Sequence, residues 1–257
     1  MRLAHISWVK AEEYFRNNDM IVIAVGSNEC HGKHIALGTD TLIPDKILDL
    51  IEEKSDVMIA PTLPYGACDD LSMFPGTITL GTDVLYSVLK KITDGFFKFG
   101  VRRFVFLNGH GGNIQVLDRI CSELHQRGAL AAELNWWLMA WELNPAWKGG
   151  HGGAEETAAV MAVNESFVDK SMIGPMELKN DIGENMITTG FRSVQYKGVT
   201  VQFPRYVKEY AGNGWIGPDH PEKATPEWGR EMLQATADYI VDFMGEMKKL
   251  KLPQPID

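Results

Sequence analysis

The sequence predicts an α/β fold with a mainly parallel sheet and helices on both of its faces. Three short apolar runs, at residues 20–25, 56–60 and 103–107, alternate with longer segments in which apolar residues recur every three or four positions. Apolar runs without alternation are typical of strands that are buried on both faces. Strands and helices that alternate along a chain form strand–helix–strand units, whose strands pair in parallel.

The first half of the chain shows this alternation most clearly. The strand at Met20–Val25 ends at Gly26, and the following residues 41–53 are expected to form a helix because their apolar side chains fall on one stripe. The second strand, at residues 56–60, ends at Pro61, which has no N–H group to donate to a neighbouring strand.

The remaining elements follow the same pattern as far as the fourth strand. Further strands are expected at residues 103–107 and 130–135, and helices at residues 82–99, 113–127, 155–164 and 226–249. Residues 172–218 are rich in glycine and lack periodicity, so we expect irregular structure or hairpins at the edge of the same domain. No linker, repeat or low-complexity tract divides the chain, and a single domain over residues 1–257 is predicted.

Composition and charge narrow the class of function. The formal net charge of −9 disfavours binding to nucleic acid or to a membrane surface, both of which are anionic. The N-terminal residues lack the pattern of a signal peptide, and no apolar run approaches the ~20 residues needed to span a bilayer. The three cysteines show no CxxC spacing, which disfavours a disulfide framework or a zinc ribbon. A cytoplasmic protein is expected.

Polar, glycine-rich loops mark the candidate site. Two of them follow the strands that end at residues 25 and 107, and a third, residues 149–157, begins a later helix. Functional groups of open α/β sheets collect at the carboxyl ends of the strands. Four of the seven histidines lie in these loops, namely His31, His34, His110 and His151. A single histidine beside glycine is usually part of a turn, but agreement among three loops favours a metal site.

The residue types in these loops suit a transition metal. Glu29 and His31 are two positions apart, so in an extended chain their side chains point to the same side. Asp40 precedes a helix, where the helix dipole favours a carboxylate, and glycines next to His110 allow close approach of the backbone. A mixed set of imidazoles and carboxylates suits zinc, manganese or iron better than calcium.

Four segments resemble, in order, the creatininase family of amidohydrolases: GSNECHGKHIALGTD, FPGT, NGHGGN and HGGAEET. The similarity runs from about Ile21 to Thr157, with a weaker echo between Gly212 and Gly229. The resemblance implies a Rossmann-like single domain, a homo-oligomer that is often a hexamer, and a centre of two divalent ions. Zinc, manganese or both are expected, and iron also fits.

The resemblance also implies roles for individual residues. Glu29, Asp40 and His110 would hold one ion. His31 and Asp40 would hold the second, with Asp40 bridging the two, and His151 would be the catalytic histidine.

The chain departs from the pattern of creatinine hydrolase at Gly112, where that enzyme has a glutamate ligand. Glu156 is the candidate replacement and Glu155 is the alternative. Adjacent residues of a helix point about 100° apart, so only one of the two is expected to reach an ion. Leu71 replaces a histidine that many members of the family carry in a loop that shapes the substrate pocket.

Several residues are candidates for contact with a substrate. Gly111 and Gly112 flank His110, and Tyr65 lies in a turn near the site. Trp137 belongs to a group of tryptophans with Trp136, Trp141 and Trp147, which could form an aromatic wall for a flat substrate or could pack in the core or in an oligomer interface.

The predicted function is therefore metal-dependent hydrolysis of a non-peptide C–N bond in a small molecule, such as a cyclic amide or a formamide, by a metal-activated water. Two alternatives remain. The same centre could hydrolyse a lactone or the formyl group of a nucleotide precursor, or the chain could be a binding or assembly protein that retains the fold without the chemistry.

Overall fold

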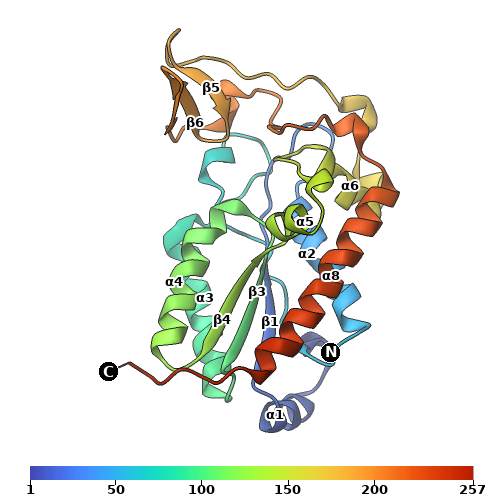
Figure 1. The fold of residues 1–257 in the computed structure, drawn as a ribbon, viewed down its shortest axis with the longest axis vertical. Helices are drawn as coiled ribbons and strands as arrows, with labels where there is room; N and C mark the ends of the chain where they lie inside the picture. Colours follow the sequence, from blue (N-terminus) through green and yellow to red (C-terminus); the bar gives the residue numbers. More distant parts are fainter. Residues whose placement is uncertain (257) are drawn as a thin grey trace.

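The computed structural model describes residues 1–256, and its centre is a four-stranded parallel sheet (Figure 1). The strand order is β2-β1-β3-β4. The strands are β1 (Met20–Val25), β2 (Met58–Ile59), β3 (Arg103–Asn108) and β4 (Leu130–Asn135). β1 lies between β2 and β3, and all six of its residues are buried, which explains its unbroken apolar sequence. The predicted α/β fold is confirmed.

The second strand is shorter than the sequence indicates. The N–H groups of Ala60 and Leu63 still donate to carbonyl groups of β1, but Pro61 between them has no N–H, so the regular ladder ends at Ile59.

Helices cover both faces of the sheet, in two separate layers of core (Figure 1). Val22 and Ala24 of β1 point into the layer formed by α2 (Thr39–Glu52), α6 (Ala154–Val163) and α8 (Pro226–Lys249). The alternate residues of β1 point into the layer formed by α3 (Gly81–Lys98) and α4 (Ile114–Gln126). Helix α8 begins and ends as predicted, and the other predicted helices differ by one or two residues at each end.

Three α-helices are absent from the predictions, including the four-residue α7 (Val207–Tyr210), which lies in the segment expected to be irregular or hairpins. Helix α1 (Trp8–Asn17) is mostly exposed and buries only Tyr14, so its sequence carries a weak apolar pattern. Helix α5 (Trp136–Leu143) follows β4 directly and is apolar on nearly every side, so it has no periodic stripe. None of the helices described is both long and apolar enough to cross a membrane.

A small antiparallel sheet lies over the end of the molecule at which the parallel strands terminate (Figure 1). It consists of β5 (Ile187–Gly190), β6 (Ser193–Tyr196) and β7 (Val199–Gln202), in that order, and is followed by α7 (Val207–Tyr210). The expected hairpins are therefore present within residues 172–218. Their position is important, because the turn between β5 and β6 reaches the candidate site.

Close packing of α8 against α6 depends on Gly229, and it yields a stability prediction. A Cβ atom on Gly229 would stand 1.9 Å from the carbonyl oxygen of Ala158, whereas one on Gly245 of the same helix would have no atom within 4 Å. We expect Gly229→Ala to lower the free energy of unfolding by about 1–3 kcal/mol through overpacking. Gly245→Ala should raise it by up to about 1 kcal/mol, because alanine is the better helix former.

Urea denaturation of the two variants and the parent protein measures both effects. Since the two changes are the same substitution in one helix, equal free energies of unfolding for the two variants would contradict the packing argument.

Candidate metal centre

The structure brings six predicted side chains together at the carboxyl end of the parallel sheet. The loop after β1 supplies Glu29 and His31, and the first turn of α2 supplies Asp40. His110 follows β3, and the loop before α6 and its first turn supply His151 and Glu156. Their potential ligand atoms form three overlapping groups, each within 4.8 Å: Glu29–Asp40–His110, His31–Asp40–Glu156 and Glu29–His31–His151.

The first group is arranged around one nitrogen of His110. Its Nδ1 atom lies 3.0 Å from Oε1 of Glu29 and 3.2 Å from Oδ2 of Asp40. Its Nε2 atom lies 3.1 Å from the carbonyl oxygen of Ala67, which can only accept a hydrogen bond. Nε2 therefore carries the hydrogen, and in the neutral ring the lone pair of Nδ1 faces the two carboxylates.

The second group uses the opposite nitrogen of His31 in the same way. Nδ1 of His31 lies 3.1 Å from the carbonyl oxygen of Glu29 and donates to it, so the lone pair of the neutral ring is on Nε2. Nε2 lies 2.9 Å from Oδ1 of Asp40 and 3.6 Å from Oε2 of Glu156. One carboxylate oxygen of Asp40 thus faces each histidine, which is the geometry of a bridging ligand.

The two groups fit divalent cations. Oε1 of Glu29, Nε2 of His31 and Oδ2 of Asp40 are buried, and none of them makes a contact with hydrogen-bond geometry among the described residues. Buried polar atoms are nearly always paired, because an unpaired one costs about 1–3 kcal/mol. Lone pairs that converge from imidazole and carboxylate groups are the donor set of zinc and manganese sites.

Electrostatics agree with a cation between these side chains. Burial lowers the pKa of His31, but the carboxylates of Asp40, Glu156 and Glu29 outweigh it and raise this pKa to about 10. The pKa of Asp40 stays below its usual value despite burial, because His31 and His110 are close. Burial raises the pKa of Glu156 to about 7. The shifts of His31 and Asp40 show that the buried carboxylates and imidazoles stabilise opposite charges on one another.

His151 lies beside the two groups with one nitrogen held by the backbone. Its Nε2 atom donates to the carbonyl oxygen of Cys30 at 2.7 Å, and its Nδ1 atom lies 3.9 Å from Oε1 of Glu29. The ring of Phe191 packs edge-on against it at 5.0 Å between centroids. Burial and the neighbouring His31 lower the pKa of His151 to about 3, so the ring is neutral at pH 7 and Nδ1 carries a lone pair.

Glu155 and Glu156 have different surroundings. Glu156 belongs to the group with His31 and Asp40, and its Oε2 atom also accepts the N–H of Gly152 at 2.6 Å. Glu155 points elsewhere on the helix, where its Oε1 atom accepts the indole N–H of Trp141 at 2.7 Å. The structure therefore places Glu156, and not Glu155, with the candidate ligands.

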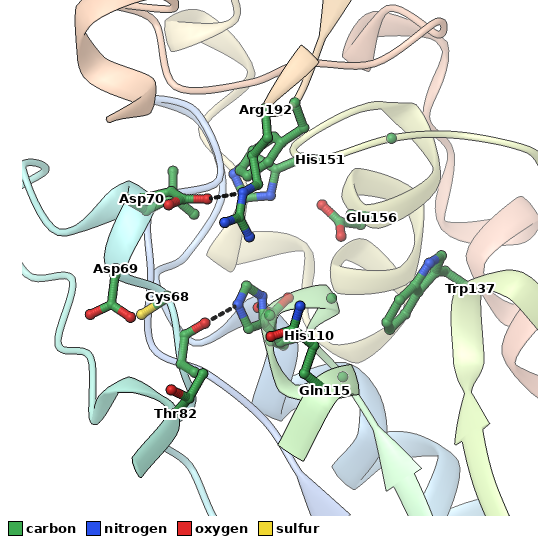
Figure 2. Close-up of a pocket in the computed structure, with 18 of the residues that line it drawn as sticks. Cys68, Asp69, Asp70, Thr82, His110, Gln115, Trp137, His151, Glu156 and Arg192 are labelled. Atoms are coloured by element: carbon green, nitrogen blue, oxygen red, sulfur yellow. Dashed lines mark hydrogen bonds and ion pairs between the residues drawn. The ribbon is translucent and has the colours of Figure 1, made fainter. Parts of the chain in front are cut away.

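A cavity of about 460 Å³ opens beside these groups (Figure 2). Gly111, Gly112 and Trp137, which the sequence suggested for substrate contact, all line it, and so does Trp141. Trp136, by contrast, is fully buried in the core.

Tyr65 requires a correction, because it does not line this cavity. Its side chain is 43% exposed and faces a separate hollow beside Phe167. The next residue, Gly66, takes the inward position, where a Cβ atom would stand 2.6 Å from the carbonyl oxygen of Gly26. Position near a site in the sequence does not determine which way a turn residue points.

Several residues that line the cavity were not predicted from the sequence. They include Gln115 of α4, Thr82 of α3, and Phe191 and Arg192 of the β5–β6 turn. Asp70 lies opposite Arg192, with its Oδ2 atom 3.0 Å from Nε of the arginine. No motif marks Phe191 and Arg192, since their segment lacks periodicity and they approach the site only through the fold of the small sheet.

Comparison with known proteins gives a consistent group of relatives. The family model described as creatininase, creatinine amidohydrolase, matches residues 4–244. The mycofactocin precursor peptide peptidase of Mycolicibacterium smegmatis is 29% identical over 70% of this chain and 73% of its own length. The creatinine amidohydrolase of Pseudomonas putida is 26% identical over 65% of this chain and 73% of its own length. The 3-dehydro-scyllo-inosose hydrolase of Thermotoga maritima is 25% identical over 94% of this chain and 83% of its own length.

Solved structures show the same fold. A crystal structure of creatinine amidohydrolase superposes with a TM-score of 0.76 at 22% identity, over 97% of this chain and 98% of that one. Other superposable structures are described as a manganese form of creatininase, with a TM-score of 0.76, and as a Zn-Zn type of a creatininase mutant, with a TM-score of 0.74. Both superpose over 97% of this chain at 22% identity. The match covers 99% of the manganese form and 98% of the Zn-Zn mutant.

Proposed function

The chain belongs to the creatininase family of hydrolases, and from this premise we propose that it hydrolyses an amide C–N bond in a small molecule with a metal-activated water. One observation carries the proposal. Two groups of buried ligands share Asp40 and lie at the base of a cavity, and several of their lone pairs are unpaired.

The residues divide into ligands and a proton carrier. Glu29, Asp40 and His110 would hold one divalent ion, and His31, Asp40 and Glu156 would hold the second. Such ions supply a bound water with a pKa lowered from ~15.7 towards 7 and polarise the carbonyl group of the substrate. The neutral Nδ1 atom of His151 accepts the proton released on attack and delivers it to the departing nitrogen.

The backbone contact of His151 supports this role. Since Nε2–H is committed to the carbonyl oxygen of Cys30, proton transfer has to take place at Nδ1, the nitrogen that faces Glu29. Phe191 packs against the ring of His151, and Trp137 lines the same cavity; both give apolar surface that helps to exclude bulk water from the reacting bond.

The size and lining of the cavity favour a small, partly flat substrate such as a cyclic amide or a formamide. About 460 Å³ is within the usual range for small-molecule sites, and Trp137 and Trp141 offer aromatic surface. A second candidate is a short peptide, which is favoured by the similarity to a mycofactocin precursor peptide peptidase.

Metal analysis followed by a substrate screen tests the proposal. We expect protein from metal-supplemented growth to hold about two zinc or manganese ions per chain. We expect turnover in a panel of cyclic amides, formamides, short peptides and lactones, and loss of that turnover after chelation. Metal-free protein under these conditions would favour the binding-protein alternative. Turnover restricted to lactones would instead favour hydrolysis of a lactone ester bond over that of an amide bond.

A further inference from the structure

The turn between β5 and β6 is held in a conformation that directs two side chains into the cavity. Arg192 has φ 54°, in the left-handed region that residues other than glycine seldom adopt. Its N–H donates to the hydroxyl of the buried Tyr210 at 3.3 Å, and its carbonyl oxygen accepts the N–H of Phe203 at 2.7 Å. Phe191 is thereby placed against His151, and Arg192 against Asp70.

The guanidinium of Arg192 is only partly used by the protein. Its Nε atom lies 3.0 Å from Oδ2 of Asp70, while its two Nη groups have no hydrogen-bond or ion-pair partner within residues 1–256. The side chain is 46% exposed and reaches into the cavity from the side opposite the sheet (Figure 2). Two free, coplanar Nη groups form a fork that matches the two oxygens of a carboxylate.

The charges around the cavity make Arg192 distinctive. Among the described residues that line it, Arg192 is the only lysine or arginine, and the acidic side chains are Asp40, Asp69, Asp70, Glu155 and Glu156. Asp40 and Glu156 belong to the candidate metal groups, and Glu155 accepts from Trp141. Asp70 pairs with Arg192, and Asp69 accepts the hydroxyl of Thr79. Because these acids surround Arg192, a singly charged group meets less repulsion there than a doubly charged phosphate.

We propose that Arg192 binds a carboxylate of the substrate, so that the preferred substrates are amides that carry an acid group, such as N-acyl amino acids, acidic cyclic amides or peptides with a free C-terminus. This inference rests on the proposed amide hydrolysis. Asp70 holds the guanidinium through Nε and leaves the fork free, and the acid group of the substrate would then lie across the cavity from the candidate metal groups.

Matched pairs of probes test this inference on the metal-loaded protein. Each pair contains a free acid and its carboxamide, for example N-formyl amino acids, pyroglutamate and dipeptides, and calorimetry gives both dissociation constants. We expect the acid of at least one pair to bind about 10- to 100-fold more tightly than its amide, as for a hydrogen-bonded charge pair. Arg192→Gln should remove this preference by weakening binding of the acid much more than binding of the amide, and Arg192→Lys should restore part of it.

Lys197→Gln is the matched control. Lys197 occupies the other turn of the same small sheet, at φ 47°, and does not line the cavity, so the preference for acids should survive its replacement. A preference for acids that persists in Arg192→Gln would assign it to the metal ions and overturn the inference. Equal binding of acids and amides, or no binding of any acid, would overturn it as well.

The proposed hydrolysis is tested independently in the same samples. Turnover of amides by the parent protein, together with a preference for acids that persists in Arg192→Gln, would leave the hydrolase intact while the inference fails. Arg192-dependent binding of acids without turnover of any amide would support the inference and contradict amide hydrolysis.

Discussion

Asp40→Asn is expected to reduce turnover by about 1000-fold or more and to lower the metal content from about two ions to at most one. Oδ1 of Asp40 faces His31 and Oδ2 faces His110, so this side chain is shared by both candidate positions. The amide of asparagine has no negative charge, and only one of its two terminal atoms can donate a lone pair. Metal analysis by mass spectrometry and the turnover rate on the best substrate of the panel measure the two effects.

Asp45→Asn provides a control for the same chemical change in the same helix. Asp45 hydrogen-bonds with the hydroxyl of Thr62 and does not line the cavity, so its replacement should leave metal content and turnover near those of the parent protein. Full metal content together with normal turnover in Asp40→Asn would refute the bridging role.

His151→Ala is expected to retain both ions and to lower turnover by about 100- to 10 000-fold, the usual contribution of a general acid–base. The reason is geometric: Nδ1 of His151 lies at the edge of the metal groups, while Nε2–H is held by the carbonyl oxygen of Cys30. Turnover and metal content should be measured in one preparation, with His125→Ala, an exposed residue at the end of α4, as the control.

The two measurements on His151→Ala separate three roles. Normal turnover would exclude His151 from the mechanism. Loss of an ion would instead make His151 a ligand, which the third group, Glu29–His31–His151, also permits. Only full metal content with slow turnover supports the proton carrier.

The buried half of the fold was predictable because burial leaves a clear pattern in the sequence. β1 is buried on both faces and is apolar throughout, and α8, which begins at Pro226, buries one face of an amphipathic helix. The small sheet leaves no such pattern. All four residues of β7 are exposed, so the apolar/polar alternation of residues 199–202 marks no buried face.

The same distinction applies to the candidate site. Glu29, His31 and His110 lie in loops that directly follow predicted strands, and Asp40 lies at the start of a predicted helix, so their convergence could be expected from the ends of parallel strands. Arg192 is brought over the same cavity by a hairpin that depends on long-range contacts with Tyr210 and Asp70. Local sequence does not show long-range contacts of this kind. It also does not show which way the side chain of Tyr65 points in its turn.

Anomalous diffraction from crystals grown with manganese or zinc tests the central claim most directly. We predict two peaks in the anomalous difference map. One should be bounded by Glu29, Asp40 and His110, and the other by His31, Asp40 and Glu156, with a carboxylate oxygen of Asp40 at each. A map without a peak among these side chains, or with its only peak between Glu29, His31 and His151, would contradict a two-metal centre bridged by Asp40.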